Sequence, residues 1–244
     1  MFFDFPTKEE WARLEATYPF TNLTVTEDHF RYTAHAEGTL ERFSAVPRLI
    51  TWIVHLQNRL IQARWSYVLL MFHFEKGIPD EEWFISPGRD GASVEYFPHF
   101  EMKHRMAKAQ FDYYADNFYY KLFSAWDTLG HILNVMYELE IERPSFDKAL
   151  RALELVRHAL HASLKAIVDS DDFVKMRKTR HNITHNLLPG HVGCSITKRS
   201  PDEFIIGVGS YTPSAVVKEN VVASLDLFAK TLNAIKAQSI SDAS

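Results

Sequence analysis

The apolar positions of the chain recur at steps of three and four residues over four stretches, which is the spacing of one face of an α-helix. The first stretch follows Pro47 and has its apolar face at Leu49, Ile53, Leu56, Leu60, Val68 and Phe72. The second has the face Phe111, Tyr114, Phe118, Leu122, Trp126, Leu129, Leu133 and Met136. The third, after Ser145, comprises Phe146, Leu150, Leu153, Val156, Leu160, Leu164 and Ile167, and the fourth, after Pro213, comprises Val217, Val221, Leu225, Phe228, Leu232 and Ile235. The pattern predicts a mainly all-α protein, an antiparallel bundle of four long helices.

The segment before the first long helix has a different pattern. Thr7 followed by Glu10 has the form of a capping box and predicts a short helix that ends near Tyr18. Residues 22–36 alternate weakly and predict a strand. We therefore expect residues 1–44 to be an N-terminal extension of helix and strand, packed on a helical domain of residues 45–240.

Two further segments interrupt the helical pattern. Residues 77–99 contain Pro79, Pro87 and Pro98 together with glycines, and this composition predicts a long loop. Residues 192–208 form two apolar runs around a Ser-Pro-Asp turn, so we expect a short β-hairpin before the last helix.

Composition narrows the class of protein. The longest apolar stretch is far shorter than the ~20 residues that cross a bilayer, and the N-terminus lacks the features of a secretory signal. A single cysteine, Cys194, leaves no internal disulfide. We therefore expect a cytoplasmic protein that does not contact a membrane.

Charge points to one local feature. The net charge of −4 argues against a surface that is basic throughout. Four cations nevertheless fall within six residues, and these are Lys175, Arg177, Lys178 and Arg180. The chain therefore carries one local basic patch, although it is slightly acidic as a whole, because screening confines charge effects to about 10 Å.

The basic segment leads into Arg180-His181-Asn182-Ile183-Thr184-His185, the densest group of reactive side chains in the chain. Four residues separate Arg180 from His185, which on an ideal helix places them about 140° apart, on adjoining faces. A guanidinium binds phosphate oxygens, and an imidazole transfers protons near neutral pH. The plainer interpretation is that these cations favourably meet the dipole at a helix C-terminus.

The same residues allow a second chemistry. His181 and His185 lie four apart on one helical face, and His191 and Cys194 follow closely. Two imidazoles on a helix, a third imidazole and a thiolate could bind zinc, but their spacing matches no zinc motif and we expect no metal.

Arg-x4-His with a polar residue after the Arg, together with the segment Asp116 to Asp127 in an aromatic second helix, resembles HEPN domains (higher eukaryotes and prokaryotes nucleotide-binding). The resemblance covers roughly residues 45–238 and is closest to a bacterial subgroup. It implies a four-helix bundle with the motif near the end of the third helix.

The resemblance also implies a function. It implies RNA cleavage by a homodimer that needs no metal or other cofactor, in a defence or toxin–antitoxin system with a protein antitoxin as partner. Carried onto this chain, Arg180 would bind the phosphate, His185 would transfer protons and His181 would support Arg180. On the same basis, the RNA-binding residues would be Lys175, Arg177 and Lys178, which would contact the RNA backbone. The alternative is a non-catalytic HEPN bundle that binds RNA, a nucleotide or a protein partner.

The aromatic second helix leaves one choice open. The aromatic run Tyr113-Tyr114 and Phe118-Tyr119-Tyr120 could stack on bases, but its helical spacing favours packing in the core. Likewise, Asp116, Asn117 and Asp127 could be inward functional groups, although residues of this kind more commonly mark the solvent face or bond to neighbouring helices.

Overall fold

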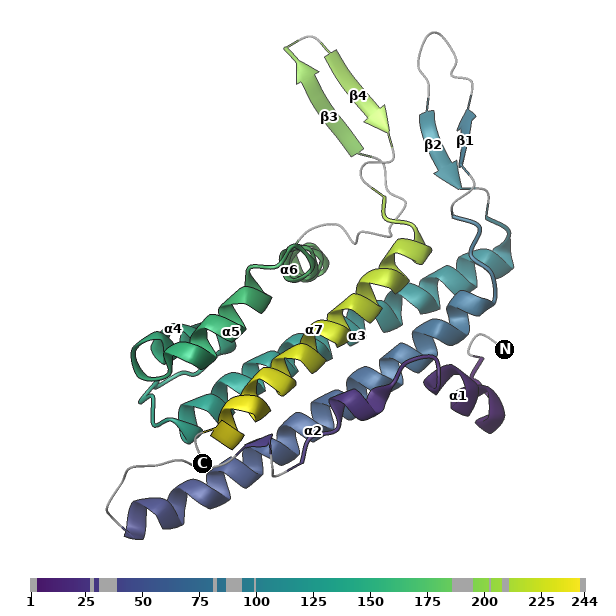
Figure 1. Ribbon diagram of the computed structural model, residues 1–244. Helices are drawn as coiled ribbons and strands as arrows, with labels where there is room; N and C mark the ends of the chain where they lie inside the picture. The colour runs from purple at the N-terminus through teal and green to yellow at the C-terminus, as the bar shows by residue number, and fades with distance from the viewer. Residues whose placement is uncertain are drawn as a thin grey trace.

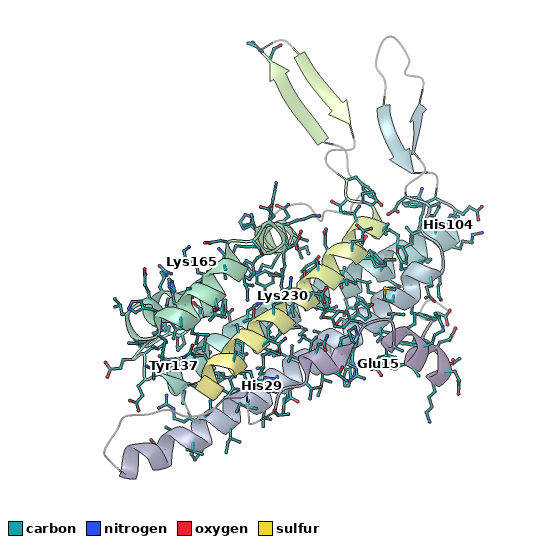
Figure 2. All side chains as sticks on the ribbon, viewed as in Figure 1. Glu15, His29, His104, Tyr137, Lys165 and Lys230 are labelled. Carbon is teal, nitrogen blue, oxygen red and sulfur yellow. The ribbon has the colours of Figure 1, made fainter. Side chains whose placement is uncertain are left out.

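Three long helices form the body of the protein. In the computed structural model, α2 (Thr39–Glu75), α3 (Met102–Met136) and α7 (Ser214–Ser241) run side by side (Figure 1). The structure describes residues 4–26, 29–30, 39–80, 83–86, 94–98, 100–185, 195–201, 203–207 and 211–241. The predicted apolar faces of these helices are buried between them, apart from Tyr114, which is half-buried. Charged side chains such as Lys165 and Lys230 lie outside this packed interior (Figure 2).

The third predicted helix, whose apolar face runs from Phe146 to Ile167, is divided into two shorter helices, and a further helix carries Arg180 to His185. These are α4 (Phe146–Val156), α5 (His158–Val168) and α6 (Asp171–His185). Arg157 leaves the helical conformation (φ −148°, ψ 68°) and places its guanidinium 5.2 Å from the ring of Tyr137. The apolar face breaks at the same point, since Val156 is 47% exposed. In Figure 1, α6 is seen along its axis whereas the long helices lie in the plane of the view, so α6 crosses the bundle.

The N-terminal segment packs on α2 and α7. Helix α1 (Lys8–Glu15) begins with the predicted capping box, in which the backbone amide of Glu10 donates to Thr7 Oγ1 at 3.2 Å. A short 3₁₀ helix, η1 (Phe20–Leu23), follows. The strand predicted over residues 22–36 is wrong for the part of that range that the structure describes, which contains η1 and irregular backbone. The hydroxyl of Tyr18 donates to Asp226 of α7 at 2.9 Å and fastens the segment to the bundle.

Helix α2 starts earlier than predicted, so Pro47 lies inside it rather than in its first turn. The helix continues through Pro47 although proline has no N–H to donate. Because α2 begins at Thr39, it also spans the domain boundary predicted between residues 44 and 45. The division into an extension and a bundle stays a prediction.

Two antiparallel hairpins extend from one end of the bundle (Figure 1). Strand β1 (Trp83–Ser86) pairs with β2 (Val94–Pro98), and β3 (Ser195–Ser200) pairs with β4 (Glu203–Gly207). The loop predicted over residues 77–99 therefore contains two paired strands. The segment predicted as a hairpin before the last helix carries β3 and β4, with Ile196 opposite Ile206. None of the helices in the described ranges is long and apolar enough to cross a membrane.

A buried carboxylate ties the end of α2 to the start of α7. Asp80 is 1% exposed, and its Oδ2 accepts hydrogen bonds from Tyr211 Oη (2.7 Å), Ser214 N (2.8 Å) and Ser214 Oγ (2.7 Å). We expect Asp80→Ala to lower the free energy of unfolding by about 3 kcal/mol, because it leaves these donors buried without their acceptor. Urea denaturation measures this loss. Asp4→Ala, which removes an exposed carboxylate, is the control, and an equal effect of the two variants would contradict the role of Asp80.

Candidate functional site

Helix α6 is fixed on the bundle by an aromatic cluster around Trp126 of α3. The Trp126 ring lies 5.2 Å from Phe173 of α6, 5.6 Å from Phe146 of α4 and 4.8 Å from Phe228 of α7. Phe173 and Met176 are buried, and Arg180 and Ile183 are half-buried. These four positions recur at steps of three and four and form the inward face of α6. Arg180 thus belongs to the side of α6 that meets α3.

Arg180 lies over an aromatic ring of α3, and its charge acts on a carboxyl group of the same helix. Its guanidinium is 5.7 Å from the centre of the Phe123 ring, a cation–π contact. Asp127 follows one turn later on α3. Burial raises the pKa of Asp127, while a hydrogen bond from the backbone of Phe146 and the charge of Arg180 oppose the rise. The contact with Phe123 therefore places the guanidinium against α3, on the side of the helix where Asp127 lies one turn further on.

His181 and His185 lie on the same helix as Arg180, as the sequence predicts. His181 is exposed, and His185 is the last residue of α6. The side chain of His185 lies outside the described residues. Because α6 remains helical through His185, the backbone positions of Arg180 and His185 keep the separation of about 140° expected of a helix.

His191 and Cys194 of the alternative zinc set also lie outside the described residues. Among the side chains that the structure describes, no three histidine, cysteine, aspartate or glutamate residues gather in a metal-binding arrangement.

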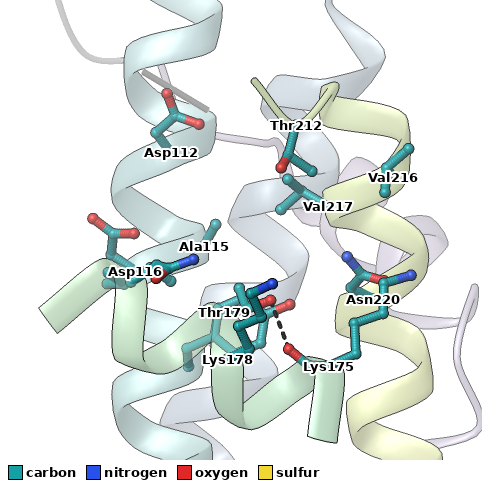
Figure 3. Close-up of a pocket in the computed structure, with 13 residues that line it drawn as sticks. Asp112, Ala115, Asp116, Lys175, Lys178, Thr179, Thr212, Val216, Val217 and Asn220 are labelled. Carbon is teal, nitrogen blue, oxygen red and sulfur yellow. Dashed lines mark hydrogen bonds between the residues drawn. The ribbon is translucent and has the colours of Figure 1, made fainter. Parts of the chain in front are cut away.

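The basic segment of α6 divides between two surfaces. Lys175 and Lys178 line a pocket of about 290 Å³ between α3, α6 and α7, which we call the lysine groove (Figure 3). Arg177 points elsewhere: it pairs with Asp147 of α4 at 2.7 Å and lies 5.3 Å from the Phe173 ring. The lysine groove is lined by Asp112, Ala115, Asp116, Tyr119, Lys175, Lys178, Thr179, Asn182, Ile183, Thr212, Val216, Val217 and Asn220.

Two carboxylates of α3 face the lysines across this groove. Lys108 Nζ donates to both oxygens of Asp112 at 2.6 Å. Burial first, and the nearby charge of Asp112 second, raise the pKa of Asp116 to about 6, against the opposite effect of Lys108. Asp116 therefore changes its charge near neutral pH. From the sequence, Asp116 could be identified only as one of three polar residues, with Asn117 and Asp127, in an aromatic helix. Its place opposite the lysines of α6 could not be predicted.

A second pocket adjoins the first on the other side of Ile183, and we call it the tyrosine groove. It is lined by Tyr113, Asp116, Asn117, Tyr119, Tyr120, Arg180 and Ile183. Tyr113 is 61% exposed and Tyr120 is 65% exposed, whereas Phe118 and Tyr119 are buried. The expectation that this aromatic run packs in the core is therefore wrong for Tyr113 and Tyr120. Both rings fall outside the apolar face of α3, but so does the buried Tyr119, so position relative to that face does not distinguish the exposed rings.

The long helices, crossed by the shorter helix that carries Arg-x4-His, define the protein as a helical-bundle domain. A family model described as Cthe2314-like HEPN matches residues 52–239. The chain belongs to the HEPN family, and its function is related to nucleotides or RNA. No curated protein and no solved structure matches the chain significantly.

Proposed function

We propose that the protein is a metal-independent endoribonuclease that acts as a homodimer, with Arg180 and His185 in the active site and His181 in support. One observation carries the proposal: Arg180 lies against Phe123 of α3 on the helix that also bears both histidines, in a chain of the HEPN family. This arrangement gives a phosphate-binding cation and proton-transferring groups fixed positions on one rigid element.

The chemistry follows from these residue types. Attack of a ribose 2′-oxygen on the adjacent phosphorus forms a new P–O bond and expels the 5′-oxygen of the next nucleotide. A base must take the 2′-proton, an acid must protonate the leaving oxygen, and a cation must stabilise charge on the phosphoryl oxygens. Histidine suits both proton transfers, and the guanidinium fork of Arg180 suits the phosphoryl oxygens.

One chain supplies one Arg180 and one His185, whereas the reaction uses an acid and a base together. A two-fold dimer that brings two α6 helices together would supply two of each residue. His185 of one protomer would then act as base and its counterpart as acid. Lys175 and Lys178 in the lysine groove would contact the RNA backbone, while Arg177, already paired with Asp147, would contribute less.

The test is cleavage of an unstructured RNA in the presence of EDTA, with mass spectrometry of the product ends. We expect 2′,3′-cyclic phosphate and 5′-hydroxyl ends, and no cleavage at a site where the 2′-hydroxyl is replaced by hydrogen. RNA that the dimeric protein binds through Arg180 but leaves intact would support the non-catalytic alternative instead. Cleavage that stops in EDTA would contradict the metal-independent chemistry.

Asp116 gives the proposal a pH dependence. It faces Lys175 and Lys178 of α6 and has Lys108 and Asp112 on its own helix, while α7 contributes only uncharged residues to the groove. As pH falls through about 6, Asp116 loses its negative charge and its repulsion of phosphate. We expect Asp116→Asn to strengthen RNA binding severalfold at pH 7.5 and to match wild type near pH 5. Fluorescence anisotropy against pH measures this, and equal affinity of the two proteins at pH 7.5 would contradict it.

A further inference from the structure

We infer that Tyr113 and Tyr120 form a binding site for unpaired nucleobases, beside the phosphate that Arg180 would bind. This inference rests on the proposed function and adds to it a substrate class, single-stranded RNA, and the surface that recognises it. The two tyrosines lie seven residues apart on α3, so two helical turns separate them by about 10 Å on one face.

The exposure of these rings is unusual for the helix that bears them. The apolar face of α3 is buried, yet Tyr113 and Tyr120 are more than half exposed, and both line the tyrosine groove together with Arg180. A tyrosine presents a large flat surface with few rotatable bonds, and stacking on a base needs no particular base identity. Core packing does not explain these two rings.

Neighbouring rings hold Tyr113 in place. Tyr113 meets Tyr114 edge-on, with centroids 5.2 Å apart and an interplanar angle of 78°. Tyr114 stacks in turn on the buried His73, at 5.7 Å and 9°. A ring positioned in this way loses little freedom when a base stacks on it.

Two cations lie beside the aromatic positions. Lys121 Nζ lies 5.4 Å from the Tyr120 ring centre, and Arg180 lines the tyrosine groove from α6, where the carboxyl group of Asp116 also lines it. Rings beside cations suit a single-stranded nucleic acid, whose bases stack while its phosphates pair with the cations. Asn117, which also lines the groove, makes this surface polar rather than a purely apolar face for a protein partner.

The test uses a short single-stranded RNA that is 2′-O-methylated throughout, so that it binds without being cut, and that carries the fluorescent base 2-aminopurine. Anisotropy gives its affinity, and fluorescence quenching reports stacking of the base. We expect Tyr113→Ala and Tyr120→Ala each to weaken binding about tenfold and to reduce quenching, whereas the phenylalanine variants, which keep the ring, bind like wild type. Met102→Ala, an exposed change on the same helix, is the matched control and keeps wild-type affinity.

Three results would overturn the inference. If both alanine variants bind and quench like wild type while Arg180→Ala weakens binding, the stacking site is refuted and the proposed function stands. If wild type does not bind the RNA, the proposed function fails and the inference fails with it. If the alanine variants lose their dimeric mass in solution, while folded by circular dichroism, the two rings form an interface between copies of the chain.

Discussion

Arg180→Ala and His185→Ala each lower the rate of RNA cleavage by about a thousandfold, the largest effects expected of any substitution in this chain. Removing the guanidinium takes away the cation that lies against Phe123, so the charge that develops on the phosphoryl oxygens is no longer stabilised. Removing the imidazole takes away the group that transfers protons. Single-turnover rates with excess dimer measure both effects on the chemical step.

Two further arginine variants sharpen this result. Arg177→Ala changes the same residue type one turn earlier on α6, but its partner is Asp147 on α4, so we expect a rate within a few fold of wild type. Arg180→Lys keeps the charge and loses the planar fork, and we expect it to recover only a small part of the lost rate. If Arg177→Ala were as slow as Arg180→Ala, the assignment of Arg180 would be wrong.

The second large effect is on stability. We expect Gly130→Ala to lower the free energy of unfolding by about 3 kcal/mol. A Cβ at position 130 would lie 2.4 Å from the carbonyl carbon of Ser145 and 2.6 Å from the backbone nitrogen of Phe146, so the start of α4 must move. Phe146 also contacts Trp126, which anchors Phe173 of α6, so the displacement reaches the candidate site.

Chemical denaturation measures this loss of unfolding free energy. The variant Ala109→Gly is the comparison, because it gives the cost of an Ala–Gly exchange on α3 without a close contact. Ala109 is exposed on the same helix, so its replacement by glycine costs about 1 kcal/mol through helix propensity alone. Alanine is the better helix former, so without the contact Gly130→Ala would stabilise α3. An unchanged or higher unfolding free energy for Gly130→Ala would therefore contradict the close approach of α3 and α4.

Much of the bundle could be predicted from the sequence because three long apolar faces are each buried by two neighbours. The break between α4 and α5 could not, since Leu153, Val156 and Leu160 continue the helical spacing across it. The break follows from the backbone conformation of Arg157 and its contact with Tyr137, a residue distant in sequence. The hairpin β1–β2 was missed because its prolines and glycines are equally typical of a loop.

The candidate site could be predicted on α6 but not on α3. Arg180, His181 and His185 lie within six consecutive residues, so the sequence places them together without knowledge of the fold. Tyr113, Asp116 and Phe123 are important only because α6 crosses α3 at this point, and the spacing of residues on α3 carries no information about which helix covers them. The sequence of α3 alone therefore does not separate the positions that α6 covers from those that face solvent.

The central claim is that two chains share one cleavage site, and a subunit-mixing experiment tests it most directly. Wild-type protein is mixed in equal amount with His185→Ala at constant total concentration, and RNA cleavage is measured after subunits have exchanged. If both His185 residues of a dimer are needed, only wild-type dimers cut, and the rate falls to about one quarter of that of wild type alone. A rate of about one half, as expected when each protomer acts alone, would contradict the shared site.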